Sequence, residues 1–217
     1  FSWASRGKTF DYLYDLNSAL QSRDELERLG VLLTGVQAKH FDVVAHSMGN
    51  LATLEAMRNL EKRRDLDSTG ELRRVILASP DVDIDLFEAQ LKDVRSIQDR
   101  ITVLISNDDR ALSLSRRLAG GVSRVGATDP KRIAALGLTV IDLTEIDDRT
   151  SSNHSKFASS PEIVKLIGRG IQSGNRLSAQ TDPSAIRTVV GGIVRGVTII
   201  PVSIVGGAQA VVVSVGN

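Results

Sequence analysis

The chain has 217 residues, of which 41% are hydrophobic and 24% charged, an ordinary globular composition that is long enough to bury one sizeable core. A net charge of +1 and an aromatic content of 4% argue against nucleic-acid binding, which needs excess positive charge or stacking rings. The absence of cysteine excludes disulfides, thiol nucleophiles and cysteine-based metal sites, and is compatible with the cytoplasm or the cell envelope. None of the three histidines, His40, His46 and His154, has a paired ligand spacing, so we expect no zinc site.

The amino-terminal segment starts with Phe1 rather than methionine and carries no visible signal peptide. Residues 1–3 have the pattern of a strand end, from which we expect further sequence upstream. Residues 8–15 carry both tyrosines and are predicted to form a loop. An amphipathic helix is predicted from about residue 17 to 34, because leucines recur along one side of it, at positions 20, 26, 29, 32 and 33.

Short apolar runs then alternate with helical patterns. The predicted strands are residues 41–45, 74–78, 101–105 and 138–143, and the predicted helices end near residues 63, 94, 118 and 171. This alternation predicts an α/β fold, with a mostly parallel sheet covered by helices on both faces. Ligands of such sheets bind at the carboxyl ends of the strands, so we look for the site there.

The carboxy-terminal part changes composition. Residues 173–187 are polar and are predicted to be a linker, whereas residues 188–217 form an apolar tail rich in glycine and valine. The uncharged window 197–215 is as long as a membrane-spanning helix, but Pro201, Gly206 and Gly207 weaken that interpretation. Two alternatives stay open for the tail: packing on its own domain or a partner as hairpin-like strands, or association with a membrane.

A serine between the first predicted strand of this series and the following helix is the strongest chemical signal. The run 41–45 leads into Ala45-His46-Ser47-Met48-Gly49, and a helical pattern starts at once. A serine hydroxyl is a poor nucleophile, so a hydrolase holds it on a sharp turn, beside a base and backbone amides. Small residues flank such a serine, and here Ala45 and Gly49 do so. We therefore predict Ser47 as a nucleophile and the Met48 amide as an oxyanion donor.

A serine nucleophile needs a base, and the base needs an acid that orients it. His154 follows the last strand of the series, where the order serine, acid, histidine places the base, so we predict it in that role. Asp109 ends the strand 101–105 and is the preferred acid. Asp108 beside it, and Asp81 after the preceding strand, are the alternatives.

Several motifs occur in order over roughly residues 1–170. They are Phe1-Ser-Trp-Ala-Ser-Arg-Gly7, Asp11-Tyr-Leu-Tyr-Asp15, Ala45-His-Ser-Met-Gly-Asn50, Pro80-Asp-Val-Asp83, and Asp108-Asp-Arg-Ala-Leu112 with Ser115-Arg-Arg-Leu-Ala-Gly-Gly121. The chain thereby resembles a bacterial family of α/β-hydrolases, esterase/lipase-like proteins of unknown function. The resemblance implies a triad of Ser47, an aspartate of the 108–109 pair, and His154. Members of that family usually begin earlier, with a His-Gly-Phe-Asn type loop that supplies the second oxyanion donor, and the chain has no such segment.

Together these observations predict an α/β-hydrolase domain over residues 1–172, incomplete at its amino terminus, followed by the linker and the tail. The predicted function is hydrolysis of carboxylic esters on small acyl substrates, through an acyl-enzyme on Ser47 and without a cofactor or metal. The alternative is a catalytically inactive scaffold of the same fold that binds a partner or a membrane, because a fold does not fix a function.

Overall fold

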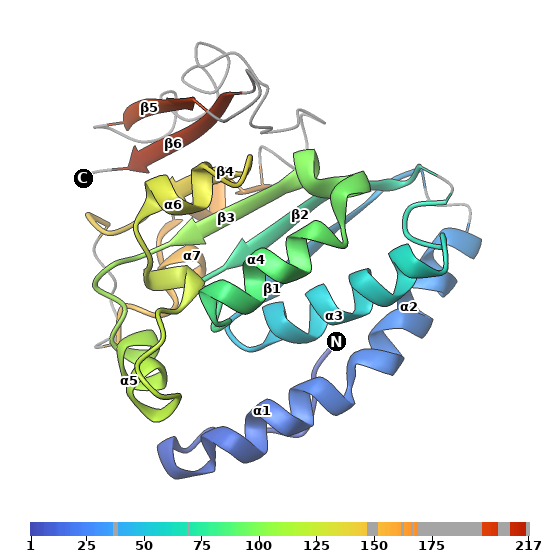
Figure 1. Ribbon diagram of the computed structural model, residues 1–217, viewed down its shortest axis with the longest axis horizontal. Helices are drawn as coiled ribbons and strands as arrows, with labels where there is room; N and C mark the ends of the chain where they lie inside the picture. The colour runs from blue at the N-terminus through green and yellow to red at the C-terminus, as the bar shows by residue number, and fades with distance from the viewer. Residues whose placement is uncertain are drawn as a thin grey trace.

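A sheet with helices on both faces forms the body of the protein in the computed structural model, which describes residues 1–36, 39–68, 70–146, 152–161, 163–165, 167–168, 197–203 and 209–215 (Figure 1). The strands are β1 (Phe41–His46), β2 (Leu72–Ala78), β3 (Ile101–Ile105), β4 (Thr139–Asp142), β5 (Val197–Ser203) and β6 (Gln209–Val215). The sheet order is β1-β2-β3-β4-β6-β5, and every neighbouring pair is parallel except β5 and β6. The predicted α/β class and mostly parallel sheet are therefore confirmed.

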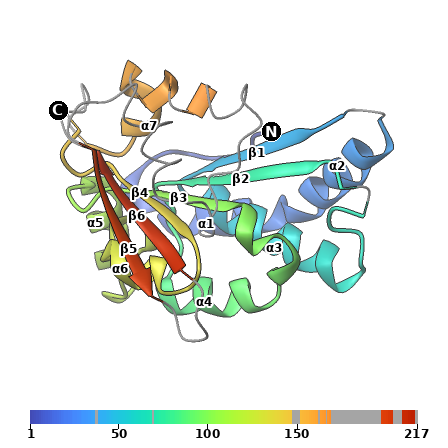
Figure 2. The same ribbon diagram turned by 90° about the horizontal axis from the view of Figure 1, so that it is seen from above.

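The helices and short 3₁₀ turns surround this sheet. They are η1 (Thr9–Asp11), α1 (Tyr12–Gln21), α2 (Arg23–Gly35), α3 (Gly49–Lys62), α4 (Ile84–Lys92), η2 (Arg95–Arg100), α5 (Arg110–Leu118), η3 (Val125–Ala127), α6 (Pro130–Ala134) and α7 (Lys156–Ser159). Figure 2 shows α3, α4 and α6 on one face of the sheet and α7 on the other. Both faces of the parallel strands are thus covered, which explains their continuous apolar sequences.

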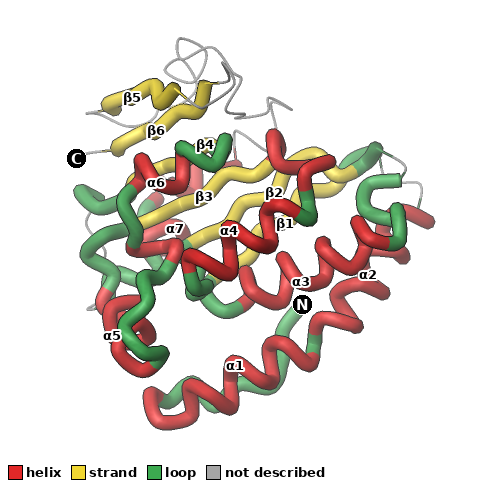
Figure 3. Tube along the Cα trace, viewed as in Figure 1, coloured by secondary structure: helices red, strands yellow, loops and turns green. Residues whose placement is uncertain are grey.

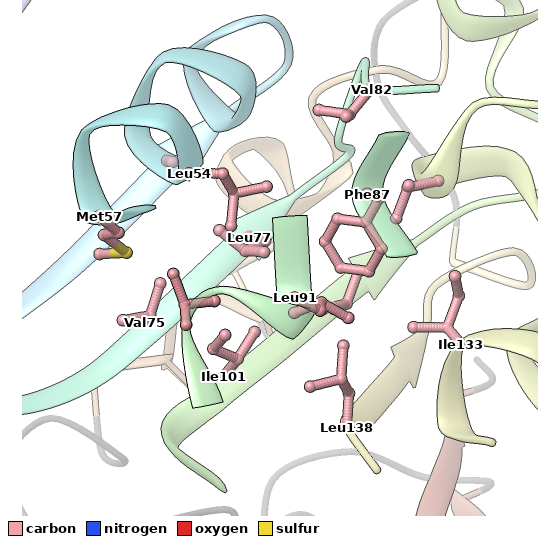
Figure 4. Packing of buried hydrophobic residues seen from close by; sticks show 14 of the residues in the cluster. Leu54, Met57, Val75, Leu77, Val82, Phe87, Leu91, Ile101, Ile133 and Leu138 are labelled. Atoms are coloured by element: carbon pink, nitrogen blue, oxygen red, sulfur yellow. The ribbon is translucent and has the colours of Figure 1, made fainter. Parts of the chain in front are cut away.

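The main core lies between the sheet and the helices α3 and α4. Side chains from α3 (Leu54 and Met57) and α4 (Phe87 and Leu91) pack on β2 and β3 (Figure 4). Phe87 is completely buried in this cluster. Burying a side chain of this size stabilises a fold by about 1.5–3 kcal/mol, so this face anchors the strands whose ends carry the candidate site.

The carboxyl ends of β1 to β4 lie at one end of the sheet, since the register pairs His46 with Ala78 and Ile105 with Asp142. Backbone hydrogen bonds join the residues that leave the strands: Ser47 N–H donates to Ala78 O at 3.1 Å, and Ser79 N–H donates to the carbonyl of β3 residue 104 at 3.0 Å. Figure 3 shows the loops gathered at this end, beside α5 and α7. The topology therefore brings residues far apart in sequence to one edge.

The amino-terminal segment differs from the sequence prediction. Residues 1–8 have no regular secondary structure, so the strand end predicted at residues 1–3 is wrong. The loop predicted at residues 8–15 is largely helical, because η1 and α1 occupy it. The inner side of α1 includes the buried Asp15, which accepts hydrogen bonds from Ser5 Oγ at 3.0 Å and from two backbone amides. A buried carboxylate on the inner face hides the apolar periodicity from which a helix is predicted.

The helix predicted from 17 to 34 is two helices. The backbone turns at Ser22, whose hydroxyl donates to Ala19 O at 2.7 Å and competes with the helical pattern. Downstream, the predicted strands and the helices ending near 63, 94 and 118 are confirmed within a few residues. Residues 161, 163–165 and 167–168 are helical, as predicted, and the remainder of that predicted helix lies outside the described residues.

The carboxy-terminal tail contributes β5 and β6, which pair with each other antiparallel, and β6 pairs with β4 from residue 211 onward. This is a hairpin-like arrangement packed on the same sheet. The predicted linker, residues 173–187, lies outside the described residues. In the described parts of the chain, no helix combines the length and the apolar character needed to cross a membrane.

One long side of β1 is open. Among the described strands, β1 has a single neighbour, β2. A cavity of about 540 Å³ runs along this side, between β1, the helices α2 and α3, and the amino-terminal Phe1 and Trp3. Within the described part of the chain, the strand that leads to Ser47 is thus also an edge of the sheet.

Candidate active site

Ser47 lies on a sharp turn between β1 and α3. Its φ of 52° falls in the left-handed region, which costs a non-glycine residue about 1–2 kcal/mol. The turn is held by its own carbonyl, which accepts hydrogen bonds from Asp81 N–H at 3.2 Å and from Asn50 Nδ2 at 2.8 Å. Asn50 Nδ2 also donates to Ala78 O at 3.0 Å. The completely buried Asn50 therefore ties the strained turn to the end of the neighbouring strand.

Gly49 is required by a close approach of Trp3. A Cβ atom at position 49 would lie 3.2 Å from the Trp3 ring. Ala45, on the other side of the serine turn, is buried with 6% of its surface exposed. Small residues therefore stand on both sides of Ser47.

Met48 begins the helix that follows the turn. Its φ and ψ of −59° and −23° are helical, and its carbonyl accepts from Leu51 N–H at 3.0 Å. Among the described residues, the Met48 N–H has no hydrogen-bond acceptor. The first amides of a helix lack partners within the helix and carry its positive dipole end, so this N–H is a suitable donor to a negative oxygen beside Ser47.

Asp109 and His154 contact each other. His154 Nδ1 lies 2.7 Å from Asp109 Oδ2, and the Asp109 side chain is fully buried while that of His154 is 16% exposed. The second carboxylate oxygen of Asp109 accepts from Leu112 N–H at 2.9 Å, at the first turn of α5. The helix start therefore fixes the carboxylate, and the carboxylate in turn fixes the imidazole; in the neutral ring that donates from Nδ1, Nε2 is the nitrogen that can accept a proton.

Asp108 binds Lys156 and Asn153 and makes no hydrogen bond to the His154 ring among the described residues. Its carboxylate accepts from Lys156 Nζ at 2.7 Å and from Asn153 Nδ2 at 2.8 Å. Of the two neighbouring aspartates, the alternative acid Asp108 therefore binds Lys156, whereas the preferred acid Asp109 binds His154. Asp109 is the one that contacts the histidine.

Among the described residues, no hydrogen bond or ion pair joins Asp81, the other alternative acid, to His154, although the charge of His154 acts on its carboxylate. Its carboxylate accepts from Ser115 Oγ, and lies 3.4 Å from both Tyr12 Oη and Arg124 Nε. The Arg124 contact is an ion pair without hydrogen-bond alignment. Burial raises the pKa of Asp81, and this effect is opposed by the Ser115 hydrogen bond and by the charges of Arg124 and His154. This cluster joins α1, the β2 loop and α5 immediately behind the serine turn.

His46 lies against the loop that carries His154. Its Nε2 is 3.2 Å from His154 O, and its ring centroid lies 4.7 Å from that of His154 and 4.8 Å from that of Phe157. Burial, then the neighbouring charge of His154, lowers the pKa of His46. Because Ser47 is the next residue along the chain, these contacts bring the His154 loop beside the serine turn.

The arrangement places a strained serine, an unsatisfied helix amide and a carboxylate-bound histidine at one end of the sheet. Among the described residues, no hydrogen bond joins Ser47 Oγ to His154, and catalytic hydrogen bonds often tighten only when substrate is bound. Sequence reasoning missed Lys156 and the Tyr12–Ser115 pair. Tyr12 and Ser115 both stood in the motifs that carried the family resemblance, and this was their only signal.

Within the described parts of the chain, no three histidine, aspartate or glutamate side chains converge as metal ligands. Comparison with known proteins gives one family: residues 1–170 match a model described as an alpha/beta hydrolase of unknown function (DUF900). No curated protein and no solved structure matches the chain.

Proposed function

The chain belongs to this family of alpha/beta hydrolases of unknown function, and from that premise we propose that it is a serine hydrolase that cleaves carboxylic esters through an acyl-enzyme on Ser47. The family match covers residues 1–170 and confirms both the predicted resemblance and the α/β-hydrolase fold. The family supports hydrolase activity in general, whereas the ester substrate and the roles of Ser47, Asp109 and His154 are our proposal.

The observation that carries the proposal is the 2.7 Å contact between His154 Nδ1 and the fully buried Asp109. In the neutral imidazole, a carboxylate that accepts from Nδ1–H leaves Nε2 as the nitrogen without a proton, which is the form that a general base needs. An exposed loop histidine without a catalytic role would not require such a partner. The serine turn beside this pair supplies a nucleophile held in a conformation that serine rarely adopts.

In the proposed reaction, Ser47 Oγ attacks the acyl carbon while His154 Nε2 takes the hydroxyl proton. The carbonyl oxygen becomes an oxyanion, which accepts a hydrogen bond from the Met48 amide. The tetrahedral intermediate expels the alcohol, which receives the proton from His154 and leaves an ester on Ser47. Water then attacks the acyl carbon while His154 Nε2 takes its proton. The bond from the acyl carbon to Ser47 Oγ breaks, Oγ receives the proton from His154, and the carboxylic acid is released. Asp109 orients His154 and stabilises its imidazolium form throughout.

The proposal is tested by exposing the protein to a fluorophosphonate probe and locating the adduct by mass spectrometry. We expect one adduct, on Ser47, and its loss in Ser47→Ala and in His154→Ala. Ser79→Ala is the matched control, because Ser79 follows the neighbouring strand and also has a positive φ, of 42°. This variant should label like the wild type. Hydrolysis of p-nitrophenyl esters of increasing acyl length then tests the substrate class.

A wild-type protein that neither labels at Ser47 nor hydrolyses any ester of the series would overturn the proposal. That outcome would favour the alternative, a scaffold that uses the hydrolase fold for binding. If Ser47 were still labelled in His154→Ala, the role of His154 as the base would be contradicted, while Ser47 would remain the proposed nucleophile.

A further inference from the structure

Lys156 is one of the most deeply buried side chains of the protein, although lysine is almost never fully buried unless it is paired. Only 1% of the surface of Lys156 is exposed to solvent. The ammonium lies 2.7 and 2.9 Å from the two carboxylate oxygens of Asp108, 3.1 Å from Leu143 O and 2.9 Å from Thr144 O. A lysine has three N–H donors, and these acceptors satisfy all of them. Removing the ammonium from water costs free energy, and the four acceptors around it offset that desolvation cost.

The acceptors of Lys156 come from two different strand ends. Asp108 follows β3, and the two carbonyls follow β4. Asn153, on the other side of His154 in sequence, donates to the same Asp108 carboxylate at 2.8 Å, and Ser106 Oγ also contacts it. The residues that flank the histidine are thus both anchored on Asp108. The His154 loop is held at two points on either side of the residue proposed as the base.

We infer that Lys156 and Asp108 are positioning residues for His154, and that their ion pair also sets the charge balance around the imidazole. This inference rests on the proposed function of Ser47 and His154. By binding Asp108, Lys156 neutralises the carboxylate next in sequence to Asp109, and among the described residues Asp109 is the carboxylate within hydrogen-bond distance of the histidine ring. If the ion pair only held the His154 loop in place, its loss would lower activity without changing the pH dependence. An effect on the charge around the imidazole would also change the pH dependence of activity.

Several charged or titratable groups face the His154 loop: Asp109 and Asp108 at the end of β3, His46 at the end of β1, Asp81 after β2, and Lys156 on α7. Removing the positive charge of Lys156 leaves Asp108 as an additional unpaired carboxylate near the imidazole, which favours the protonated ring. Removing the negative charge of Asp108 leaves the Lys156 cation unpaired, which disfavours the protonated ring. The two changes break one ion pair but act on the histidine with opposite sign.

The test compares Lys156→Met, Asp108→Asn and the double variant with the wild type, using p-nitrophenyl acetate over a range of pH. Both single variants should lose about 10- to 100-fold in kcat with little change in KM, because the base is displaced from the reacting atoms. The acid limb of the activity profile should move up by about 0.5–1 pH unit in Lys156→Met and down in Asp108→Asn. The double variant should return to the wild-type limb while kcat stays low.

Lys165→Met is the control, because Lys165 is an exposed lysine on the following helical segment and should leave kcat and the profile unchanged. If Lys156→Met fails to fold, the test uses Asp108→Asn and the conservative variant Lys156→Arg. Lys156→Arg keeps the positive charge, so the acid limb of its activity profile should stay at the wild-type pH. Acid limbs that stay in place or move in the same direction overturn the inference. A wild-type protein without esterase activity or Ser47 labelling overturns the proposed function instead, so the two failures are distinguishable.

Discussion

His154 Nδ1 lies 2.7 Å from Asp109 Oδ2, although the two residues are 45 positions apart in the chain. The contact forms because β3 and β4 are parallel neighbours, so that the loops after them leave from the same edge. Arg110 N–H, next to Asp109, donates to Ser152 O at 2.9 Å and ties the same two loops through the backbone. The pair therefore depends on the sheet rather than on either loop alone.

Asp109→Asn should lower kcat about 10⁴-fold while leaving the fold intact. The amide oxygen can still accept from Leu112 N–H, so the start of α5 is preserved. The amide NH₂, however, would donate to His154 Nδ1 and force the ring proton onto Nε2, where it blocks the base. Ester hydrolysis and a thermal unfolding curve measure the two effects separately. Asp129→Asn is the control, because Asp129 caps α6 in the same manner and should leave kcat unchanged.

Ser47→Gly should raise the free energy of unfolding by about 1 kcal/mol and abolish fluorophosphonate labelling. Glycine adopts the φ of 52° without the steric cost that serine has there. Arg64→Gly provides the comparison, because Arg64 has a φ of 61° in an exposed turn, and it should stabilise similarly without loss of labelling. Urea denaturation gives both values. A Ser47→Gly protein less stable than the wild type would argue against strain at the turn.

Gly49→Ala should destabilise the protein by about 1 kcal/mol and shift the fluorescence of Trp3, the only tryptophan of the chain. The added methyl would lie 3.2 Å from the indole, closer than carbon atoms normally approach, so the ring must move. Gly35→Ala is matched to it, since a Cβ atom at position 35 meets nothing within 4 Å. That variant should leave the emission unchanged. An unshifted spectrum in Gly49→Ala would show that Trp3 does not press on the turn.

His46 should make the fold less stable as the pH is lowered. Burial, then the charge of His154, holds the pKa of His46 below its ordinary value, so the unfolded chain binds a proton that the folded chain does not. The stabilisation by His46 is present above the unfolded pKa of about 6.5 and is lost as pH falls toward the folded pKa. His46→Phe keeps a ring against Phe157 and should flatten the loss of urea stability below about pH 6.5. If the stability of His46→Phe fell as steeply below that pH as the stability of the wild type, the loss would come from groups other than His46.

The sheet was predictable because its strands are short apolar runs bounded by polar turns. The run 101–105, for example, ends at Ser106 and Asn107, and β3 covers the same residues. Helix α1 was not predictable from periodicity, because its inner face carries the carboxylate Asp15 where an apolar residue is expected. Residues 5–7, in the segment before the helix, donate the hydrogen bonds that stabilise this buried carboxylate. That partnership becomes visible only when the chain is folded.

The residue types of the candidate site and its preferred acid were predictable, since Asp109 was chosen from its place after the strand 101–105, and its carboxylate lies 2.7 Å from His154 Nδ1. Asp108 stayed an alternative, because both aspartates follow the same strand and the sequence does not show what holds each one. The choice depends on α5, whose first turn holds Asp109, and on Lys156, which holds Asp108. Lys156 itself lies in a polar stretch after His154, where a lysine is ordinarily exposed.

Among the described strands, β1 lies at the border of the sheet and has β2 as its one neighbour. An edge strand presents a row of backbone N–H and C=O groups that can pair with another chain. The sequence of β1 has one charged residue, Asp42, which is held by Arg73 and Arg74, and Val44 is 46% exposed. Within the described residues, the free side of β1 can therefore accept a further strand by backbone hydrogen bonding, and that strand would lie beside the one that presents Ser47.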